Sequence, residues 1–257
     1  GALTVANGAS FTTDANSGVI NLGSLALTGG SLTLDTNGTG TATIVNTVGI
    51  DLAANTTIGG ATSITATTGN ITDSGTFTVG AGGASFVTTA NDATINLGTL
   101  AVTGDITLTT NDAVGTDANA TIVNATAISF GASTVDGALT AIATTGTITD
   151  TGALTVGGAG SFTTAQNDQA ITLDTTTNAI TGAVTFTTAT AGGNTGNVTI
   201  DNGTTALDFA ASSIDGSLTA TSGNVGGITD SGTVTVTGAG SFTTDANSGV
   251  LNLNQLA

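Results

Sequence analysis

Apolar and polar residues alternate along this chain in short runs. Typical runs are Leu32-Thr33-Leu34, Ile106-Thr107-Leu108 and Val184-Thr185-Phe186. A period of two places successive side chains on opposite faces of an extended strand, and Val, Ile, Thr and Phe favour that conformation. Gly, Asn and Asp separate the runs, and no window carries an amphipathic stripe of helical spacing. The pattern predicts an all-β protein made of many short strands, with almost no helix.

The short runs are part of a longer repeat. Its clearest landmark is Ile-Thr-Asp-Ser/Thr-Gly, which begins at Ile71, Ile148 and Ile228. Each copy precedes a segment that ends in Ser-Phe, and a segment of the same kind opens the chain. These segments end at Phe11, Phe86, Phe162 and Phe242. Ser10 to Ala26 also returns as Ser241 to Ala257 with three changes. A long internal period of this kind predicts a solenoid.

Three strand cores recur in each block and subdivide it. The last residues of the successive cores are 5, 27, 52, 79, 102, 130, 156, 180, 209 and 236. We therefore expect about ten coils of roughly 22–29 residues, with three coils in each block of roughly 75–80 residues. The predicted fold is a right-handed parallel β-helix (a β-solenoid) with three short strands in each coil, running as one continuous segment over residues 1–257.

Neither end of the sequence carries a polar segment that would cap a solenoid. The first residues already follow the repeat, and the last residues restart it. Because solenoids need capped ends to stay soluble, we expect either a window of a longer repetitive chain or a unit that stacks end to end on its neighbours.

Composition supports a packed solenoid and narrows its chemistry. The chain has 39 Gly and no Pro, Cys, Met, Trp, Tyr, His, Lys or Arg, and its 17 acidic residues are all Asp. Gly, Asn and Asp tolerate the left-handed backbone that corners require. A hydrophobic fraction of 39% and a mean hydropathy of +0.36 argue against disorder. The eight Phe alternate with polar residues in strand runs, as expected of core residues.

The charge excludes whole classes of function. A net charge of −17 without any cationic side chain leaves nothing to bind phosphate groups, so neither nucleic acid nor an anionic membrane surface is an expected partner. No run of apolar residues is long enough for a membrane span. Without His, Cys, Lys or Arg the chain has no catalytic triad and no thiolate or imidazole metal site. We predict that it is not an enzyme, with no catalytic or cofactor-binding residues.

The sequence contains two weaker kinds of candidate site. Calcium prefers oxygen ligands, and turns that offer them are Asn111-Asp112 with Asp117, and Asn167-Asp168. Asp in a turn more commonly accepts a hydrogen bond from its own backbone, and we favour that interpretation, so no metal ligand is predicted. The glycosylation signal Asn-x-Ser/Thr is also present, at Asn37, Asn55, Asn70, Asn119, Asn124, Asn197 and Asn202.

The outer faces of the predicted coils are candidate binding surfaces. The middle residues of the ten strand cores are Thr only in every third core, so we do not expect the continuous Thr array that would match ice. The longest intervals between cores predict loops that protrude near residues 111–118 and 189–197. Any surface that binds a partner is expected at these loops.

The order of the motifs resembles a known kind of protein. Ala2-Leu3-Thr4-Val5 leads to Ser10-Phe11-Thr12-Thr13 and then Ile20-Asn21-Leu22-Gly23, and later Ile64-Thr65-Ala66 leads to Ile71-Thr72-Asp73-Ser74-Gly75. This succession is similar to the long repeat tracts of filamentous-haemagglutinin-like adhesins and giant β-strand-repeat surface proteins of bacteria. The resemblance covers the whole chain and implies a right-handed parallel β-helix displayed outside the cell. It brings no binding residues with it.

The expected function is mechanical. We expect a structural segment of an extracellular filament or adhesin stalk, which provides reach, stiffness and resistance to proteolysis and self-associates into filaments or bundles. The absence of Lys and Arg removes every trypsin site. Acidic surfaces repel one another at low salt, so calcium or added salt should promote bundling. The alternative is an adhesin module that binds glycans or a cell surface with its sides or protruding loops.

Overall fold

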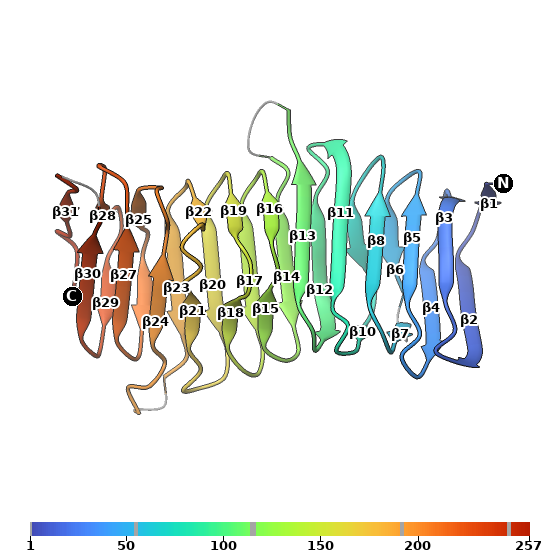
Figure 1. The fold of residues 1–257 in the computed structure, drawn as a ribbon, viewed down its shortest axis with the longest axis horizontal. Helices are drawn as coiled ribbons and strands as arrows, with labels where there is room; N and C mark the ends of the chain where they lie inside the picture. The colour runs from blue at the N-terminus through green and yellow to red at the C-terminus, as the bar shows by residue number, and fades with distance from the viewer. Residues whose placement is uncertain (1, 54–55, 114–116, 191–192, 246–247) are drawn as a thin grey trace. The chain divides into compact units, whose positions relative to one another are not determined.

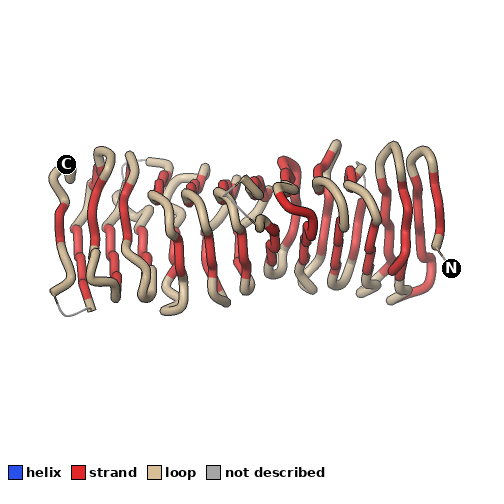
Figure 2. Tube along the Cα trace, turned by 90° about the horizontal axis from the view of Figure 1, so that it is seen from above, coloured by secondary structure: helices blue, strands red, loops and turns tan. Residues whose placement is uncertain are grey.

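The protein is an all-β solenoid. The computed structural model describes residues 2–53, 56–113, 117–190, 193–245 and 248–257, and these contain strands and turns but no helix (Figures 1 and 2). The strands stack in parallel over about eleven turns, which confirms the predicted fold class. Within these described residues, no helix is long and apolar enough to cross a membrane. The chain divides into two compact units, residues 1–126 and 127–257.

Unit 1 contains two parallel sheets, and the chain passes from one to the other and back in every turn. Its first sheet consists of β1 (Leu3–Val5), β3 (Ile20–Leu27), β5 (Ala42–Asn46), β8 (Thr62–Ala66), β11 (Ala84–Asn91) and β13 (Ile106–Asn111). Its second sheet consists of β2 (Ala9–Asn16), β4 (Leu32–Asn37), β6 (Ile50–Leu52), β7 (Thr56–Ile58), β9 (Ile71–Asp73), β10 (Phe77–Val79), β12 (Ile95–Val102) and β14 (Ala120–Asn124).

Unit 2 has the same construction. Its first sheet consists of β15 (Ile128–Phe130), β16 (Ser133–Val135), β18 (Ile148–Asp150), β19 (Leu154–Val156), β21 (Ile171–Leu173), β22 (Ala179–Ile180), β24 (Val198–Asp201), β27 (Leu218–Ser222) and β30 (Gly240–Thr244). Its second sheet consists of β17 (Leu139–Ala143), β20 (Gly160–Thr164), β23 (Val184–Thr188), β25 (Leu207–Phe209), β26 (Ser212–Ile214), β28 (Ile228–Asp230), β29 (Val234–Val236) and β31 (Leu251–Asn252).

The turns are shorter than the sequence predicted. In unit 1, Thr62 pairs with Ala42 on one side and with Ala84 on the other, so these three residues mark the starts of consecutive turns. In unit 2, Ile171, Val198 and Leu218 pair in the same succession. Three of these four turns are no longer than the shortest coil that was predicted. The predicted coil is therefore too long on average, and the solenoid has about eleven turns where about ten were expected.

The error arises because a block is not a whole number of turns. In unit 1 the strand pairings lead from Thr12 to Asp35, Thr57 and Thr78, so three turns carry the chain from Thr12 to Thr78. The repeat copy of Thr12 is Val87, which lies further along the chain and in the other sheet. Each block thus spans about three and a half turns, and the prediction of three coils to a block is wrong.

Unit 2 shows the same half turn. The pairings lead from Thr163 to Thr187, Ser213 and Thr235 in the second sheet. The repeat copy of Thr163 is Thr243, which lies in the first sheet of that unit. Within each unit, consecutive copies of the same motif therefore lie in different sheets.

Alternate residues of the strands point inward and form a continuous apolar core in each unit. Fully buried strand residues are mostly Leu, Ile, Val, Phe and Ala, and burying one large side chain contributes about 1.5–3 kcal/mol. In unit 2, four Phe rings follow one another, with centroids 6.4, 5.7 and 6.2 Å apart. Phe11 and Phe242 are half-buried. The predicted Phe core is confirmed for the other six, which have no exposed surface: Phe77, Phe86, Phe130, Phe162, Phe186 and Phe209.

One corner of unit 1 requires glycine because neighbouring turns almost touch. A Cβ atom on Gly59 would overlap the carbonyl oxygen of Gly38, and one on Gly80 would overlap that of Gly59. Any other residue would force the turns apart. The Gly-rich composition therefore serves close stacking as well as tight turning.

Candidate functional site

The aspartate of the Ile-Thr-Asp-Ser/Thr-Gly motif joins consecutive turns. Asp73, at the end of β9, accepts hydrogen bonds from the backbone N–H groups of Gly98 (2.9 Å) and Thr99 (2.7 Å) on the following turn. Asp230, at the end of β28, accepts the N–H groups of Asn254 (3.0 Å) and Gln255 (2.7 Å) in the same way. A carboxylate that accepts two backbone donors is strongly bonded, because one partner carries a charge. We call this arrangement the aspartate clamp.

The middle copy of the motif repeats the clamp with one addition. Asp150 accepts the N–H groups of Asp174 (3.1 Å) and Thr175 (3.4 Å). It also accepts the side-chain amide of Asn178, at 2.6 Å. The landmark that identified the repeat in the sequence is thus a contact that joins consecutive turns.

Three buried asparagines, evenly spaced in the sequence, form a second contact between turns. Asn46 accepts the N–H of Leu27 at 2.8 Å and donates its side-chain amide to the carbonyl of the same residue at 3.2 Å. Asn124 bonds Val102 in this way (2.9 and 2.9 Å), and Asn202 bonds Ile180 (2.8 and 3.0 Å). The side-chain amide replaces a peptide group of the sheet where the backbone turns away. The constant spacing was visible in the sequence, but its purpose was not.

These contacts exclude glycosylation at two of the predicted acceptor asparagines. Asn124 and Asn202 have no exposed surface, and both side-chain amides are hydrogen bonded. A glycan cannot be attached to either in the folded protein. Asn55 lies outside the described residues. The remaining acceptors are exposed, and they are Asn37, Asn70, Asn119 and Asn197.

A buried threonine closes corners in both units. In unit 1, Thr36 donates its hydroxyl to the carbonyl of Gly40 (2.9 Å) and accepts the N–H of Gly59 (3.1 Å) on the next turn. In unit 2, Thr188 donates to the carbonyl of Gly196 (3.1 Å) and accepts the N–H of Asp215 (2.8 Å). The two corners, which we call the Gly59 corner and the Asp215 corner, have the same hydrogen bonds but different residues at the position that the threonine holds.

Asp215 differs from the other aspartates described so far. Only 5% of its surface is exposed, and its Oδ2 atom is covered and has no hydrogen-bond partner in the described structure. The sequence did not single out this residue, because an Asp-Gly pair at a corner is an ordinary turn signal. Only its burial distinguishes it.

The structure brings together two of the three residues of the first calcium candidate, Asp112 and Asp117. Asp112 accepts the N–H of Asp117 at 3.2 Å, and Asp92, which the sequence analysis did not select, lies beside them. The charge of Asp112 raises the pKa of Asp92 above its ordinary value, with desolvation and Asp117 adding to the effect. Asn111 instead donates its amide to the carbonyl of Thr89, at 3.1 Å.

The second calcium candidate serves a loop contact. Asp168 accepts the hydroxyl of Thr195 at 2.7 Å, and the carbonyl of Asn167 accepts the side chain of Gln169 at 3.3 Å. Over the described ranges, no three acidic, His or Cys residues are grouped in a way that could hold a metal ion. Both predicted protruding loops contain undescribed residues, 114–116 and 191–192, so only their flanks are placed.

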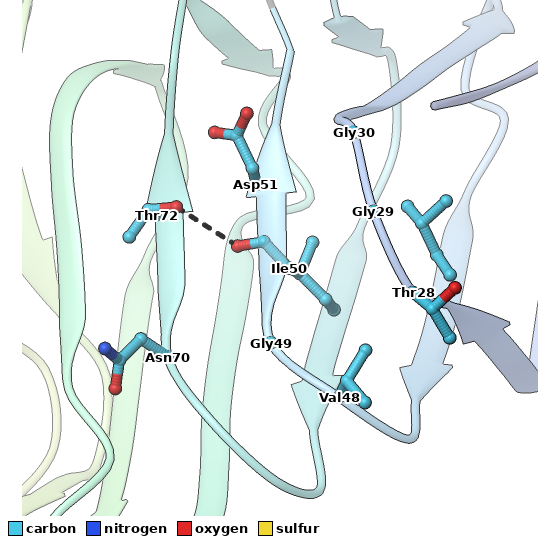
Figure 3. A pocket seen from close by; sticks show the side chains of 10 residues that line it. Thr28, Gly29, Gly30, Val48, Gly49, Ile50, Asp51, Asn70 and Thr72 are labelled. Atoms are coloured by element: carbon cyan, nitrogen blue, oxygen red, sulfur yellow. Dashed lines mark hydrogen bonds between the residues drawn. The ribbon is translucent and has the colours of Figure 1, made fainter. Parts of the chain in front are cut away.

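An open groove of about 350 Å³ crosses three turns of unit 1 (Figure 3). Its lining includes glycines, which have no side chain to fill the groove, and the polar residues Asp51, Asn70 and Thr72. Each of these three side chains makes a hydrogen bond within the fold. Asp51 accepts the hydroxyl of Ser74 (2.8 Å), Asn70 accepts the N–H of Thr94 (2.8 Å), and Thr72 donates to the carbonyl of Ile50 (3.4 Å). These three side chains thus take part in contacts between turns as well as lining the groove.

One outward column of unit 2 carries a hydroxyl group in each of six consecutive turns. It is not a continuous Thr array, because Ser stands at both of its ends. The neighbouring outward column is mixed, since Asp201 pairs with Thr221 there, so the hydroxyl column is only one residue wide. Its members pair in consecutive turns of the first sheet and all carry a hydroxyl: Ser129, Thr149, Thr172, Thr199, Thr219 and Ser241.

The chain matches one family model, that of repeats of unknown function (DUF5649). The matches cover residues 117–187 and 195–257, which together make up just over half of the chain. The offset between the starts of the two matches equals the spacing of Asn46, Asn124 and Asn202, so the family repeat corresponds to one block. No curated protein and no solved structure matches the chain. The chain therefore belongs to the DUF5649 family of repeats.

Proposed function

We propose that this chain is a structural segment of an extracellular filament or adhesin stalk. The observation that carries the proposal is that the same contacts between turns occur in both units. Aspartate clamps, buried asparagines and threonine-closed corners each join one turn to the next. In a solenoid, stability is approximately a sum of turn and neighbour terms, so such contacts allow length to increase without a new core design.

Composition and resemblance support the location. The absence of Lys and Arg leaves no site for trypsin-like proteases, which favours persistence outside a cell. The motif order resembles filamentous-haemagglutinin-like adhesins and giant β-strand-repeat surface proteins. We infer that this segment is displayed at a cell surface, where it provides reach and stiffness and self-associates into filaments or bundles.

Electron microscopy of the native surface material tests this proposal. Antibodies raised against the folded chain should label fibres on intact cells. The fibres should show the strand spacing of about 4.8 Å along their axis. Labelling confined to the cell interior would overturn the proposal. Isolated segments that each end in a separate globular tip would retain the stalk and exclude the filament.

Bundling supplies a second test. Because the surface is acidic and carries no cation, light scattering should rise as NaCl or CaCl₂ is added to the purified chain. Scattering that stays flat through both titrations would contradict self-association by screening. A rise with CaCl₂ alone, at matched ionic strength, would show that a specific cation contact is needed.

The alternative function is glycan binding, and the groove in Figure 3 is the feature that favours it. Its polar groups face an open surface, although each already has a partner in the fold. A glycan array with the purified chain distinguishes the two functions. Specific binding that is lost in Asn70→Ala but retained in Asn37→Ala would support an adhesin module in place of a stalk.

A further inference from the structure

Asp215 is a buried carboxylate that the fold does not use. Its exposed fraction is 5%, and Oδ2 has no hydrogen-bond partner within the described part of the chain. Burying a carboxylate is unfavourable unless it is paired or fully hydrogen bonded. An unpartnered, covered carboxylate oxygen therefore needs a specific explanation.

A role in the turn does not explain the side chain. Asp-Gly corners ordinarily use the carboxylate to accept the N–H groups that follow it. Here the N–H of Gly216 donates to the carbonyl of Gly196 (3.1 Å), and the N–H of Ser217 donates to the side chain of Asn197 (2.8 Å). The N–H of Asp215 itself donates to Thr188. All three backbone donors of this corner are occupied by other acceptors.

The corresponding corner of unit 1 shows that no side chain is required. Thr36 holds the N–H of Gly59 as Thr188 holds that of Asp215. The Gly59 corner closes with no carboxylate at all. The side chain of Asp215 is therefore additional to what closing the corner needs.

The protein also lacks any group that could neutralise this charge. The whole sequence contains no Lys, Arg or His. No side chain of the protein carries a positive charge that could pair with the carboxylate, so a bound cation is the charged partner that remains.

The corner that holds Asp215 brings a carbonyl and a hydroxyl oxygen together. The carbonyl of Gly196 and the hydroxyl of Thr188 meet at this corner, and the Cβ position of Gly196 lies 3.6 Å from the Cβ of Asp215. On the preceding turn, Asp168 bonds Thr195. Residues 193–197 thus lie between one carboxylate from the turn before and one from the turn after. A donor set without nitrogen or sulfur suits a hard divalent cation, for which calcium is the flexible choice.

We propose that Asp215 binds calcium at the Asp215 corner, where the cation links its carboxylate to oxygen atoms at the base of the loop formed by residues 193–197. The ion neutralises the buried charge and fixes this segment against the following turn. This site differs from Asn111-Asp112 with Asp117 and from Asn167-Asp168, which the sequence suggested. It does not depend on the chain being a stalk.

Isothermal titration of the chelator-treated full chain with CaCl₂, in enough KCl to screen nonspecific binding, tests the site. The wild type should bind one calcium ion more tightly than any other. Asp215→Asn should lose that site or bind it at least about tenfold more weakly, since even indirect supports of a metal site cost that much. The matched control is Asp136→Asn, which changes the same Asp-Gly position one block earlier, where Asp136 is half-buried. It should bind as the wild type does.

Hydrogen exchange of the wild type keeps the test decisive if a variant fails to fold. Calcium should slow exchange at residues 193–197 and at Gly216 and Ser217, and it should do so more than MgCl₂ at the same concentration. Equal binding by wild type and Asp215→Asn, or no calcium-dependent protection at these amides, would overturn the site.

Discussion

The Gly59 corner and the Asp215 corner are closed by the same threonine hydrogen bonds but leave different amounts of space. In unit 1 the hydroxyl of Thr36 bonds a carbonyl four residues ahead, and a Cβ on Gly59 would overlap a backbone oxygen. In unit 2 the hydroxyl of Thr188 bonds a carbonyl eight residues ahead, and the corner holds an aspartate. The corner with the longer hydrogen-bonded interval holds a side chain, while the hydrogen bonds of the threonine stay the same. The same threonine-closed corner can therefore present a carboxylate in one unit and serve only close packing in the other.

The largest expected effect comes from putting a methyl group into the tighter corner. Gly59→Ala should destabilise the chain by about 3 kcal/mol, because the added atom must push two stacked turns apart. Urea unfolding measures the loss. Asp215→Ala, which already has a Cβ, is the matched variant and should cost little in calcium-free buffer. Similar losses in the two variants would show that the corners do not differ in space.

The shared part of the two corners should respond alike. Thr36→Val and Thr188→Val keep the shape but leave one N–H unpaired and remove one of the two hydrogen bonds to a carbonyl, so each should cost about 2 kcal/mol. The same urea experiment measures both. The serine variants keep the hydroxyl and should recover most of the stability. If only one valine variant loses stability, the threonine bonds are not equivalent in the two units.

The aspartate clamps offer a smaller test of what the units share. Asp73→Asn in unit 1 and Asp230→Asn in unit 2 each replace an acceptor oxygen with an amide that faces an N–H donor. A loss of about 1 kcal/mol is expected for each, because both carboxylates are half-buried. Thermal unfolding gives the values, with the exposed Asp174→Asn as the control. A control that loses as much as the clamps would indicate a general charge effect.

The smallest effect concerns the acidic group in unit 1, which has no counterpart described in unit 2. The raised pKa of Asp92 means that the folded chain holds its proton to higher pH than the unfolded chain, so stability falls as pH rises through that window. Asp92→Asn should therefore melt slightly higher than wild type at pH about 7 and equally at pH about 3. Asn tolerates the left-handed backbone found there, where φ is 60°. A difference that persists at the lower pH would have to come from the backbone.

The sequence was sufficient for the fold class and much of the core. Alternation at Leu32-Thr33-Leu34 predicted strands, and six of the eight Phe are fully buried as expected. It was not sufficient for the length of a turn, because both sheets use the same alternation. Thr12 and Val87 are copies of one position that returns after three and a half turns. In the sequence, such a position has the same apolar and polar pattern around it as one that returns after three turns.

The candidate site was less predictable for a similar reason. The sequence marks Asp73, Asp150 and Asp230 by their repetition, and these prove to be clamps between turns. Asp215 has a copy at Asp136, so repetition does not set it apart. What sets it apart is the packing of residues 193–197 against it, which depends on strand register and loop length together. Register cannot be read from alternation alone.

The half turn in each block also constrains how such a chain can grow. Duplicating one block inserts three and a half turns, so every later residue of that unit exchanges one sheet for the other. A side chain selected on one face is thereby copied to the other face, and a second duplication is needed to restore it. A face with a uniform character, such as the column from Ser129 to Ser241, must then draw on different parts of the ancestral repeat in successive turns. Selection for such a surface acts on the whole block, because each segment of the block lies in one sheet in one copy and in the other sheet in the next copy.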